Sequence, residues 1–380
     1  MAKQLKIALN YSYNEAWIGG TYYIENLIWA LNTLPQNKKP IILILSTLEN
    51  YNKLKERIDY PYLSHHKIYD DRNIIWRILN KFWQIFFYSR KFEKKINVDG
   101  IFPYSGPILF LNPKNKFYWI PDFQEHFLSE LFSKEEVIAR KNNQLTIAES
   151  EDNLILSSKD AFNHFQKIYP YSKIKPYVLP FAVSLPSLEK IDFNQIKFEY
   201  QLVNNYLICA NQLWVHKDHI TLIKAVHQLK KENIKIVVYL TGKTEDYRFP
   251  NYYQQILDLI KNYQLEKQII PLGFLDRKIQ LTILKNAKAV IQPSLFEGWS
   301  TVIEDAKALN KFIIASNISI HQEQLLNYPS LLFEEKNPNK LAECIKLFMS
   351  QSIGTEFKQD YKVNIQKFGN SFLSILNNNV

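Results

Sequence analysis

A glutamate followed directly by a glycine, Glu297-Gly298, occurs in the stretch "PSLFEGWSTVIEDAKAL" at residues 293–309. A β-branched run precedes the stretch and a segment of helical period follows it, so the pair is expected in a loop at the carboxyl end of a strand. A carboxylate there is suited to binding the hydroxyls of a sugar. An ordinary loop carboxylate is the alternative that the residues leave open.

The helix expected after this loop has its own charged residues. Ser300 or Thr301 can cap its first turn, and Glu304 and Asp305 lie near its N-terminus, where the helix dipole favours negative charge. The helix dipole by itself therefore explains Glu304 and Asp305, but it does not explain Glu297.

Two further sites could hold a phosphate. Gly19 and Gly20 follow the first expected strand and open a helix, where backbone N–H groups can approach an anion; an ordinary tight turn is the alternative. In "NQLWVHKDH" (211–219), Lys217 stands at a helix start, where its ammonium can reach a diphosphate. A solvated lysine is the alternative there, and Asp218 is a candidate N-cap.

Short β-branched runs alternate with longer segments of helical period, which is the pattern of parallel βαβ units. This alternation predicts an α/β protein with two doubly wound, Rossmann-like domains that face each other across a cleft, with ligands at the carboxyl ends of the strands. The stretch 179–200 lacks a clear period and is the expected hinge. The expected strands are 5–12, 40–47, 99–105, 116–122 and 153–158 in the first half, and 206–211, 235–242, 268–274, 289–294 and 311–317 in the second.

The composition limits the class of protein. A chain of 380 residues is expected to form two to three domains. The formal net charge of +10 favours acidic partners, although an A/T-rich coding sequence is an alternative cause. The basic residues are spread without an Arg-rich block, so nucleic acid is not indicated.

Cysteine and histidine spacing gives no sign of a metal or disulfide site. Two cysteines, Cys209 and Cys344, cannot form a disulfide framework. The histidines at positions 65, 66, 164 and 227 (His65, His66, His164, His227) do not cluster with carboxylates at the spacing of metal ligands. No Asp-x-Asp motif follows a strand in a way that suggests a metal-held diphosphate, so metal-independent chemistry without a cofactor is expected.

The chain shows no apolar run of bilayer length and no signal peptide after "MAKQ", which predicts a cytoplasmic protein. Residues 72–96 are rich in aromatic residues and carry basic residues at both ends. Two interpretations remain open for them: a buried helix with a cationic outer face, or an amphipathic helix on the inner surface of an anionic membrane.

Taken together, these motifs resemble those of glycosyltransferase family 4, which are retaining enzymes of the GT-B fold. The stretch 272–309 is similar to the donor-binding signature of that family, in which Pro-Ser is followed by Glu-Gly and by an acidic residue eight positions after the first Glu. The stretches 211–219, 120–133 and 315–324 and the N-terminal Gly-Gly pair support the resemblance, in the expected order along nearly the whole chain.

The resemblance implies roles for individual residues. Glu297 would contact hydroxyls of the transferred sugar, and Gly298 would let the backbone approach it. Lys217 would bind the diphosphate under the loop of Gly19 and Gly20. The implied catalytic residues are Glu297, Lys217 and His126, and the implied donor-binding residues are Gly19, Gly20, Gln212, Lys217, Gly298, Trp299, Ser300, Thr301, Glu304 and Asp305.

Three positions depart from the family pattern. The second family Glu falls on Asp305 with Glu304 before it, so either could hold the ribose, with Asp305 favoured by register. Gln212 replaces an Arg. Pro121 replaces the His before Asp122, and His126 is a candidate substitute or an ordinary histidine.

The resemblance therefore predicts a glycosyltransferase that moves a sugar from a nucleotide-diphosphate sugar, GDP-mannose or a UDP-sugar, to a hydroxyl of a glycan or lipid-linked acceptor. Residues 1–180 would form the acceptor-side domain, 181–360 the donor domain, and 361–380 a helix that packs back on the first domain. The alternatives are a non-catalytic nucleotide-sugar-binding or glycan-assembly module and a GT-B epimerase. A phosphorylase would need a lysine-bound pyridoxal phosphate, for which no lysine context is evident.

Overall fold

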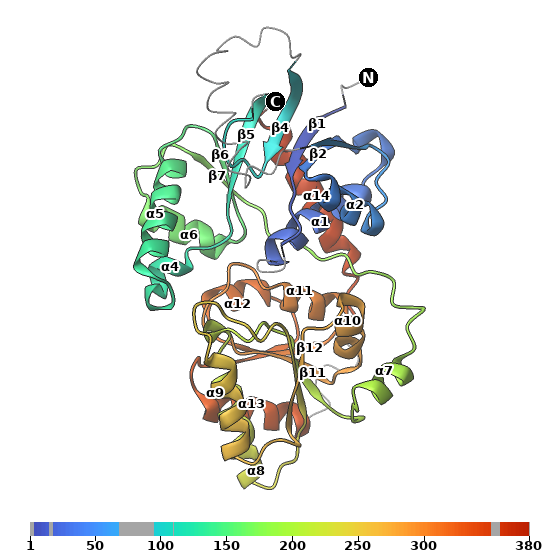
Figure 1. Ribbon diagram of the computed structural model, residues 1–380, viewed down its shortest axis with the longest axis vertical. Coiled ribbons are helices and arrows are strands. Elements are labelled where there is room, and N and C mark those ends of the chain that lie inside the picture. The colour runs from blue at the N-terminus through green and yellow to red at the C-terminus, as the bar shows by residue number, and fades with distance from the viewer. Residues whose placement is uncertain (1–3, 15–17, 68–94, 109, 351–357, 380) are drawn as a thin grey trace.

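Each half of the chain contains one parallel β-sheet. The computed structural model describes residues 4–14, 18–67, 95–108, 110–350 and 358–379. The halves lie one above the other, with their sheets covered by helices (Figure 1).

The first sheet has seven strands in the order β3-β2-β1-β4-β5-β6-β7, all paired in parallel. The strands at 41–46 and 153–156 are almost continuous apolar runs, because helices cover both faces of a parallel sheet. The strands are β1 (Lys6–Asn10), β2 (Ile41–Ser46), β3 (Leu63–Lys67), β4 (Ile96–Phe102), β5 (Leu111–Ile120), β6 (Asn153–Leu156) and β7 (Lys175–Val178).

The second sheet repeats the scheme with six parallel strands in the order β10-β9-β8-β11-β12-β13. One apolar cluster lies on each face of this sheet. The strands are β8 (Leu207–Cys209), β9 (Val238–Thr241), β10 (Ile269–Gly273), β11 (Ala289–Gln292), β12 (Phe312–Ser316) and β13 (Ser330–Phe333).

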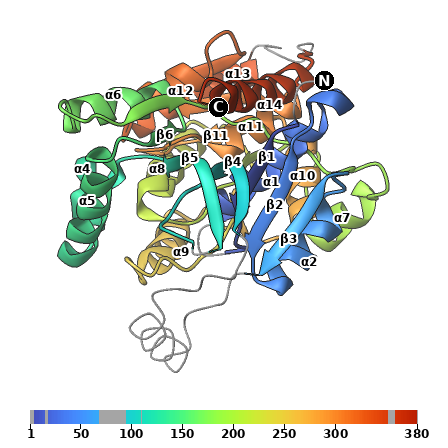
Figure 2. The same cartoon turned by 90° about the horizontal axis from the view of Figure 1, so that it is seen from above.

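Helices connect the strands of both sheets. In the first half they are α1 (Ile18–Asn32), α2 (Leu48–Arg57), α4 (Gln124–Phe127), α5 (Lys134–Ala148) and α6 (Lys159–Ile168). In the second half they are α7 (Phe193–Glu199), α8 (His219–Lys231), α9 (Tyr252–Asn262), α10 (Arg277–Asn286), α11 (Thr301–Ala308), α12 (Ser319–Gln324) and α13 (Pro338–Ser350). Short 3₁₀ helices are η2 (Gln36–Lys38), η3 (Ser129–Leu131) and η4 (Val215–Lys217). Figure 2 shows α4 and α5 at one edge of the first half and α2 with β3 at the opposite edge.

The last helix, α14 (Lys362–Asn377), returns from the second half and packs on α1 of the first. Phe368, Phe372 and Leu376 enter the core of the first half there. Gly369 allows the close approach, because a Cβ atom at this position would lie 2.7 Å from the carbonyl oxygen of Ala30.

The structure corrects several predictions. Strands β3, β7 and β13 were not predicted; β3 contains Ser64, His65, His66 and Lys67 and lies at a sheet edge, where apolar periodicity is weak. The expected hinge at 179–200 contains α7, whose N-terminus is capped by Asp192. The Gly-Gly pair opens α1, as predicted, and lies in its first turn. The stretch 72–96, for which a buried helix and a membrane-surface helix were both expected as alternatives, lies almost wholly outside the described residues. No helix within the described part of the chain is long and apolar enough to cross a bilayer.

The two halves contact each other at several points. Trp299 Nε1 donates at 2.9 Å to the carbonyl oxygen of Phe181, whose side chain belongs to the core of the first half. The Glu323 carboxylate of α12 accepts from the first backbone N–H groups of α6, those of Lys159 and Asp160, both at 2.9 Å. Glu323 thereby neutralises the positive end of a helix in the other half, which favours the observed arrangement of the halves.

Candidate active site

The strand orders of both sheets place a crevice between the two halves. In each sheet the order reverses between the first and fourth strands, β1 and β4 or β8 and β11, and ligands of open α/β sheets bind beyond the carboxyl ends at such switch points. A cavity of about 780 Å³ lies at this position and is lined by residues of both halves. This volume is within the range of about 300–1,000 Å³ typical of small-molecule sites.

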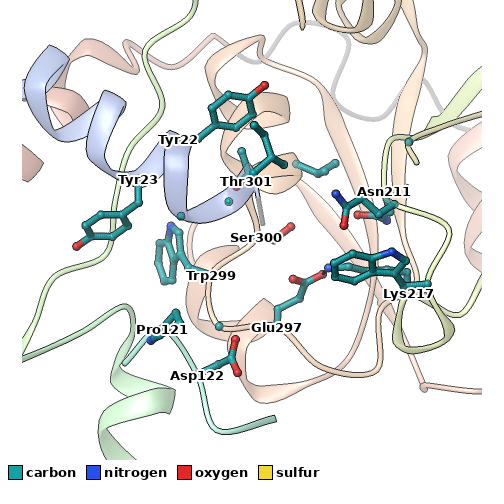
Figure 3. Close-up of a pocket in the computed structure, with 18 of the residues that line it drawn as sticks. Tyr22, Tyr23, Pro121, Asp122, Asn211, Lys217, Glu297, Trp299, Ser300 and Thr301 are labelled. Atoms are coloured by element: carbon teal, nitrogen blue, oxygen red, sulfur yellow. Dashed lines mark hydrogen bonds and ion pairs between the residues drawn. The ribbon is translucent and has the colours of Figure 1, made fainter. Parts of the chain in front are cut away.

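Lys217 and Glu297 come from the loops after β8 and β11 and meet in this cavity (Figure 3). Lys217 Nζ lies 2.6 Å from Glu297 Oε1, and the Gln292 side-chain amide donates to the same oxygen at 2.8 Å. Burial by itself would raise the pKa of Glu297, but the Lys217 ammonium holds that pKa below its ordinary value. The cavity therefore contains a fixed carboxylate beside a fixed cation.

Gly298 has a steric role that sequence reasoning did not predict. A Cβ atom at this position would lie 2.5 Å from the carbonyl oxygen of Pro121 and 3.0 Å from Cβ of Asp122. Both residues follow β5 of the first half, so the glycine permits close contact between the two halves. Because Gly298 also lines the cavity, its loop contributes both to this contact and to the site.

The N-terminal turn of α1 forms the opposite wall. Gly19 and Gly20 line the cavity, and the Tyr22 ring lies 5.1 Å from the guanidinium carbon of Arg277 at the start of α10. Arg277 in turn binds Asp305 through two hydrogen bonds of 2.7 and 2.5 Å. A helix N-terminus from one half thus faces a bidentate ion pair from the other.

Glu304 and Asp305 occupy different environments. Asp305 lines the cavity, whereas Glu304 does not. The Glu304 carboxylate accepts from Lys307 at 2.9 Å, from Gln324 at 2.9 Å and from the hydroxyl of Tyr361. Glu304 therefore connects α11 to α12 and to the start of α14, and the structure does not bring it to the site.

The remaining predicted donor residues lie at the cavity. Gln212, Trp299, Ser300 and Thr301 all line it. Ser300 is the N-cap of α11, where its side chain accepts from the backbone N–H of Ile303. Asp218 caps α8 in the same way, through the backbone N–H of Thr221.

The structure does not bring His126 to the cavity. Its Nε2 atom lies 2.9 Å from Gln144 Oε1, and its ring packs edge-on against Phe123 and Tyr169. Gln144 itself lines the cavity. His126 packs among the helices of the first half because α4 turns its side chain towards α5, and this position does not support a catalytic role.

Several cavity residues were missed by sequence reasoning. Asp122, which served there only as a point of reference, lines the cavity together with Arg57, Arg140 and Arg248. Burial raises the pKa of Asp122 above its ordinary value. The position of Asp122 after an expected strand was an available signal, whereas the three arginines lie on helices or a long loop with no distinguishing spacing.

No group of three or more His, Cys, Asp or Glu side chains that could hold a metal ion occurs among the residues for which the structure gives positions.

Comparison with known proteins identifies the class. Residues 192–368 match the family model described as glycosyl transferases group 1. Residues 192–368 therefore form a domain of the glycosyl transferases group 1 family, which makes the protein a glycosyltransferase. No curated protein matches the chain at a significant level.

Solved structures of the GT-B type match the chain over its whole length and confirm the predicted fold. A glycosyltransferase from Rickettsia africae ESF-5 is similar with a TM-score of 0.68 at 16% identity, covering 99% of this chain and 98% of that chain. HepE from Anabaena, in complex with UDP and glucose, has a TM-score of 0.65 at 13% identity, with 98% and 100% covered. Sucrose-phosphate synthase from Thermosynechococcus elongatus has a TM-score of 0.61 at 15% identity, with 99% and 94% covered.

Proposed function

We propose that this glycosyltransferase moves a sugar from a nucleotide-diphosphate sugar to a hydroxyl group of a glycan or lipid-linked acceptor, with retention of configuration at the anomeric carbon. The observation that carries the proposal is the pair of Lys217 and Glu297, held at 2.6 Å in a cavity between the two halves. A fixed cation is suited to a diphosphate, and a fixed carboxylate is suited to sugar hydroxyls.

The two halves have different roles in this proposal. The second half, roughly residues 181–360, binds the donor: Lys217 binds the diphosphate, Asp305 the ribose and Glu297 the sugar. The first half, residues 1–180, brings Gly19 and Gly20 of α1 over the diphosphate and binds the acceptor. Figure 3 supports this order, because Glu297 lies between Tyr22 of α1 on one side and Asp122 on the other.

The proposed reaction breaks the bond between the anomeric carbon and the diphosphate oxygen, which keeps the bonding electrons. The acceptor oxygen forms its new bond to the anomeric carbon on the same face, and its proton passes to an oxygen of the leaving diphosphate. Lys217 and the N-terminus of α1 stabilise the negative charge that develops on the diphosphate. This mechanism requires neither a protein nucleophile nor a metal ion.

The donor base is proposed to be uracil or guanine. HepE from Anabaena, which shares the fold, was solved with UDP-glucose, which supports a UDP-sugar. The histidine-rich form of the loop 216–219 favours GDP-mannose. The proposed location of the protein is the cytoplasm, at the inner surface of the membrane.

Thermal unfolding with UDP, GDP, ADP and dTDP tests the proposal, because a ligand that binds only the native state raises the unfolding midpoint. We expect one nucleotide to raise the midpoint of the wild type and Lys217→Ala to reduce that rise. Lys224→Ala removes an exposed lysine of α8 outside the cavity and serves as the matched control.

A second variant separates sugar binding from diphosphate binding. Glu297→Gln should leave the shift by the nucleoside diphosphate intact, since that ligand has no sugar at the Glu297 position, but should lower turnover of the nucleotide sugar. Slow hydrolysis of the donor without acceptor distinguishes a transferase from a non-catalytic binding module. The proposal fails if no nucleotide stabilises the wild type, or if Lys217→Ala and Lys224→Ala behave alike.

A further inference from the structure

Two arginines from opposite halves of the protein converge at the cavity. Arg140 lies on α5 of the first half, and Arg248 lies in the loop between β9 and α9 of the second; both line the cavity. Their guanidinium carbons lie 4.8 and 4.9 Å from the centre of the same ring, that of Phe132. The two guanidinium groups are therefore no more than about 10 Å apart, close enough for one ligand to contact both.

These two arginines differ from the other cavity cations in how closely a carboxylate of the protein neutralises them. Lys217, Arg277 and Arg57 have carboxylate oxygens at 2.6, 2.5 and 3.1 Å. The nearest carboxylate contacts of Arg140 and Arg248 are longer, 3.7 Å to Glu125 and 3.4 Å to Asp246. Charge-assisted hydrogen bonds normally measure about 2.7–2.9 Å, so these two guanidinium groups retain the capacity to bind an anion.

Aromatic rings hold both guanidinium groups in place. Arg248 lies 5.2 Å from the centre of the Trp214 ring and 5.6 Å from that of Tyr247, in addition to Phe132. The Tyr247 hydroxyl donates to Glu136 of α5 at 2.8 Å, which ties the loop of Arg248 to the helix of Arg140. Arginine stacked on aromatic rings loses little conformational freedom when it binds a carboxylate or phosphate.

Arg140 is set apart from the proposed donor site, whereas Arg248 borders it by stacking on Trp214 in the loop of Lys217. The helix N-terminus at Gly19 and Gly20 and the Arg277–Asp305 pair meet through Tyr22. Arg140 lies on the side of Asp122 instead, where its charge offsets part of the burial that raises the pKa of that carboxyl. Asp122 adjoins Gly298, next to Glu297, so an acceptor that reaches the transferred sugar would pass Asp122.

We propose that the acceptor carries an anionic group, a carboxylate or a phosphate, and that Arg140 and Arg248 bind this group together. The acceptor class is then an acidic saccharide or a phosphorylated one. The inference rests on the proposed function, since it assigns a substrate to the acceptor side of the same cavity.

The test uses monosaccharide probes that differ only at carbon 6: glucose, glucuronate and glucose 6-phosphate. The affinity of each for the protein saturated with its nucleoside diphosphate is measured by titration calorimetry. We expect at least one charged probe to bind about tenfold or more tightly than glucose, because a hydrogen bond to a charged group has roughly this magnitude. The stronger of the two charged probes identifies a carboxylate or a phosphate as the anionic group.

Arg140→Gln and Arg248→Gln should each abolish the preference for the charged probe. Lys141→Gln, one residue further along α5 and outside the cavity, removes the same charge and should preserve it. Arg140 has 47% of its side chain exposed, so its replacement should not unfold the protein, and an unchanged unfolding midpoint verifies this.

Equal affinity for charged and neutral probes overturns the inference, and so does failure of both charged probes to bind at millimolar concentration. A preference that persists in Arg140→Gln, or that Lys141→Gln removes equally, also overturns it. Failure of the wild type to bind any nucleoside diphosphate is a separate result, which refutes the proposed function and the inference with it.

Discussion

Replacement of Gly298 by alanine separates cleft closure from folding. The added Cβ atom would lie 2.5 Å from the Pro121 carbonyl oxygen, 3.0 Å from Asp122 Cβ and 3.1 Å from the Pro121 carbonyl carbon. Two of these are backbone atoms, which cannot rotate away, and all belong to the other half of the protein. The loop of Gly298 or the whole first half must therefore move.

The cost of this movement can be estimated. Insertion of a methyl group into a packed contact typically costs about 1–3 kcal/mol, which corresponds to roughly a 5- to 150-fold change in an equilibrium. The contact joins the two halves, and Gly298 is half-buried at the cavity, whereas Gly369 is buried. We therefore expect the cost to disfavour closure of the cleft and to leave the unfolding midpoint nearly unchanged.

The assay compares kcat/KM for the nucleotide sugar with the midpoint of thermal unfolding, for the wild type and for Gly298→Ala. Gly369→Ala provides the matched contrast, because its Cβ atom would lie 2.7 Å from the Ala30 carbonyl oxygen inside the first half. Gly369→Ala should lower the unfolding midpoint, whereas Gly298→Ala should lower kcat/KM by about tenfold or more at an unchanged midpoint.

Two results would refute this reasoning. In one, Gly298→Ala retains the kcat/KM of the wild type, which would mean that the contact with Pro121 does not exist in the active state. In the other, Gly298→Ala lowers the unfolding midpoint as much as Gly369→Ala does, which would mean that the contact belongs to the folding core.

Two further predictions concern stability. Tyr361→Phe removes the hydroxyl that donates to Glu304 and accepts from the backbone N–H of Val183 at 3.1 Å. We therefore expect the free energy of unfolding, measured with urea, to fall by about 1–3 kcal/mol. An unchanged free energy of unfolding would contradict the role of Glu304 as the link between α11 and α14. Burial lowers the pKa of His321 to about 4, from about 6.5 in an unfolded chain. Between these two pH values the unfolded state takes up a proton at this residue and the folded state does not. The free energy of unfolding should therefore fall as the pH drops through this window, by up to about 1.4 kcal/mol per pH unit for this group. His321→Gln should remove up to about one proton from the uptake on unfolding measured near pH 5, and an unchanged uptake there would show that His321 does not titrate in this way.

The sequence by itself determined the fold class and the positions of most strands. Apolar runs such as 41–46 and 312–316 are local signals, because a strand buried on both faces needs apolar residues throughout. The caps at Ser300 and Asp218 were also predictable, since an N-cap depends on residues only three positions apart. Edge strands such as β3 and β7 were not, because solvent on one side weakens the apolar pattern.

The tertiary structure alone decided how the candidate site is assembled. Lys217 and Glu297 are 80 positions apart, and only the pairing of β8 with β11 brings their loops together. The partner of Asp305 is Arg277, and the partners of Glu304 include Tyr361, so the roles of two adjacent carboxylates depend on contacts from distant helices. Gly298 contacts Pro121 and Arg140 lies near Arg248 for the same reason: contacts between the two halves depend on how two complete sheets dock, which no local pattern in the sequence records.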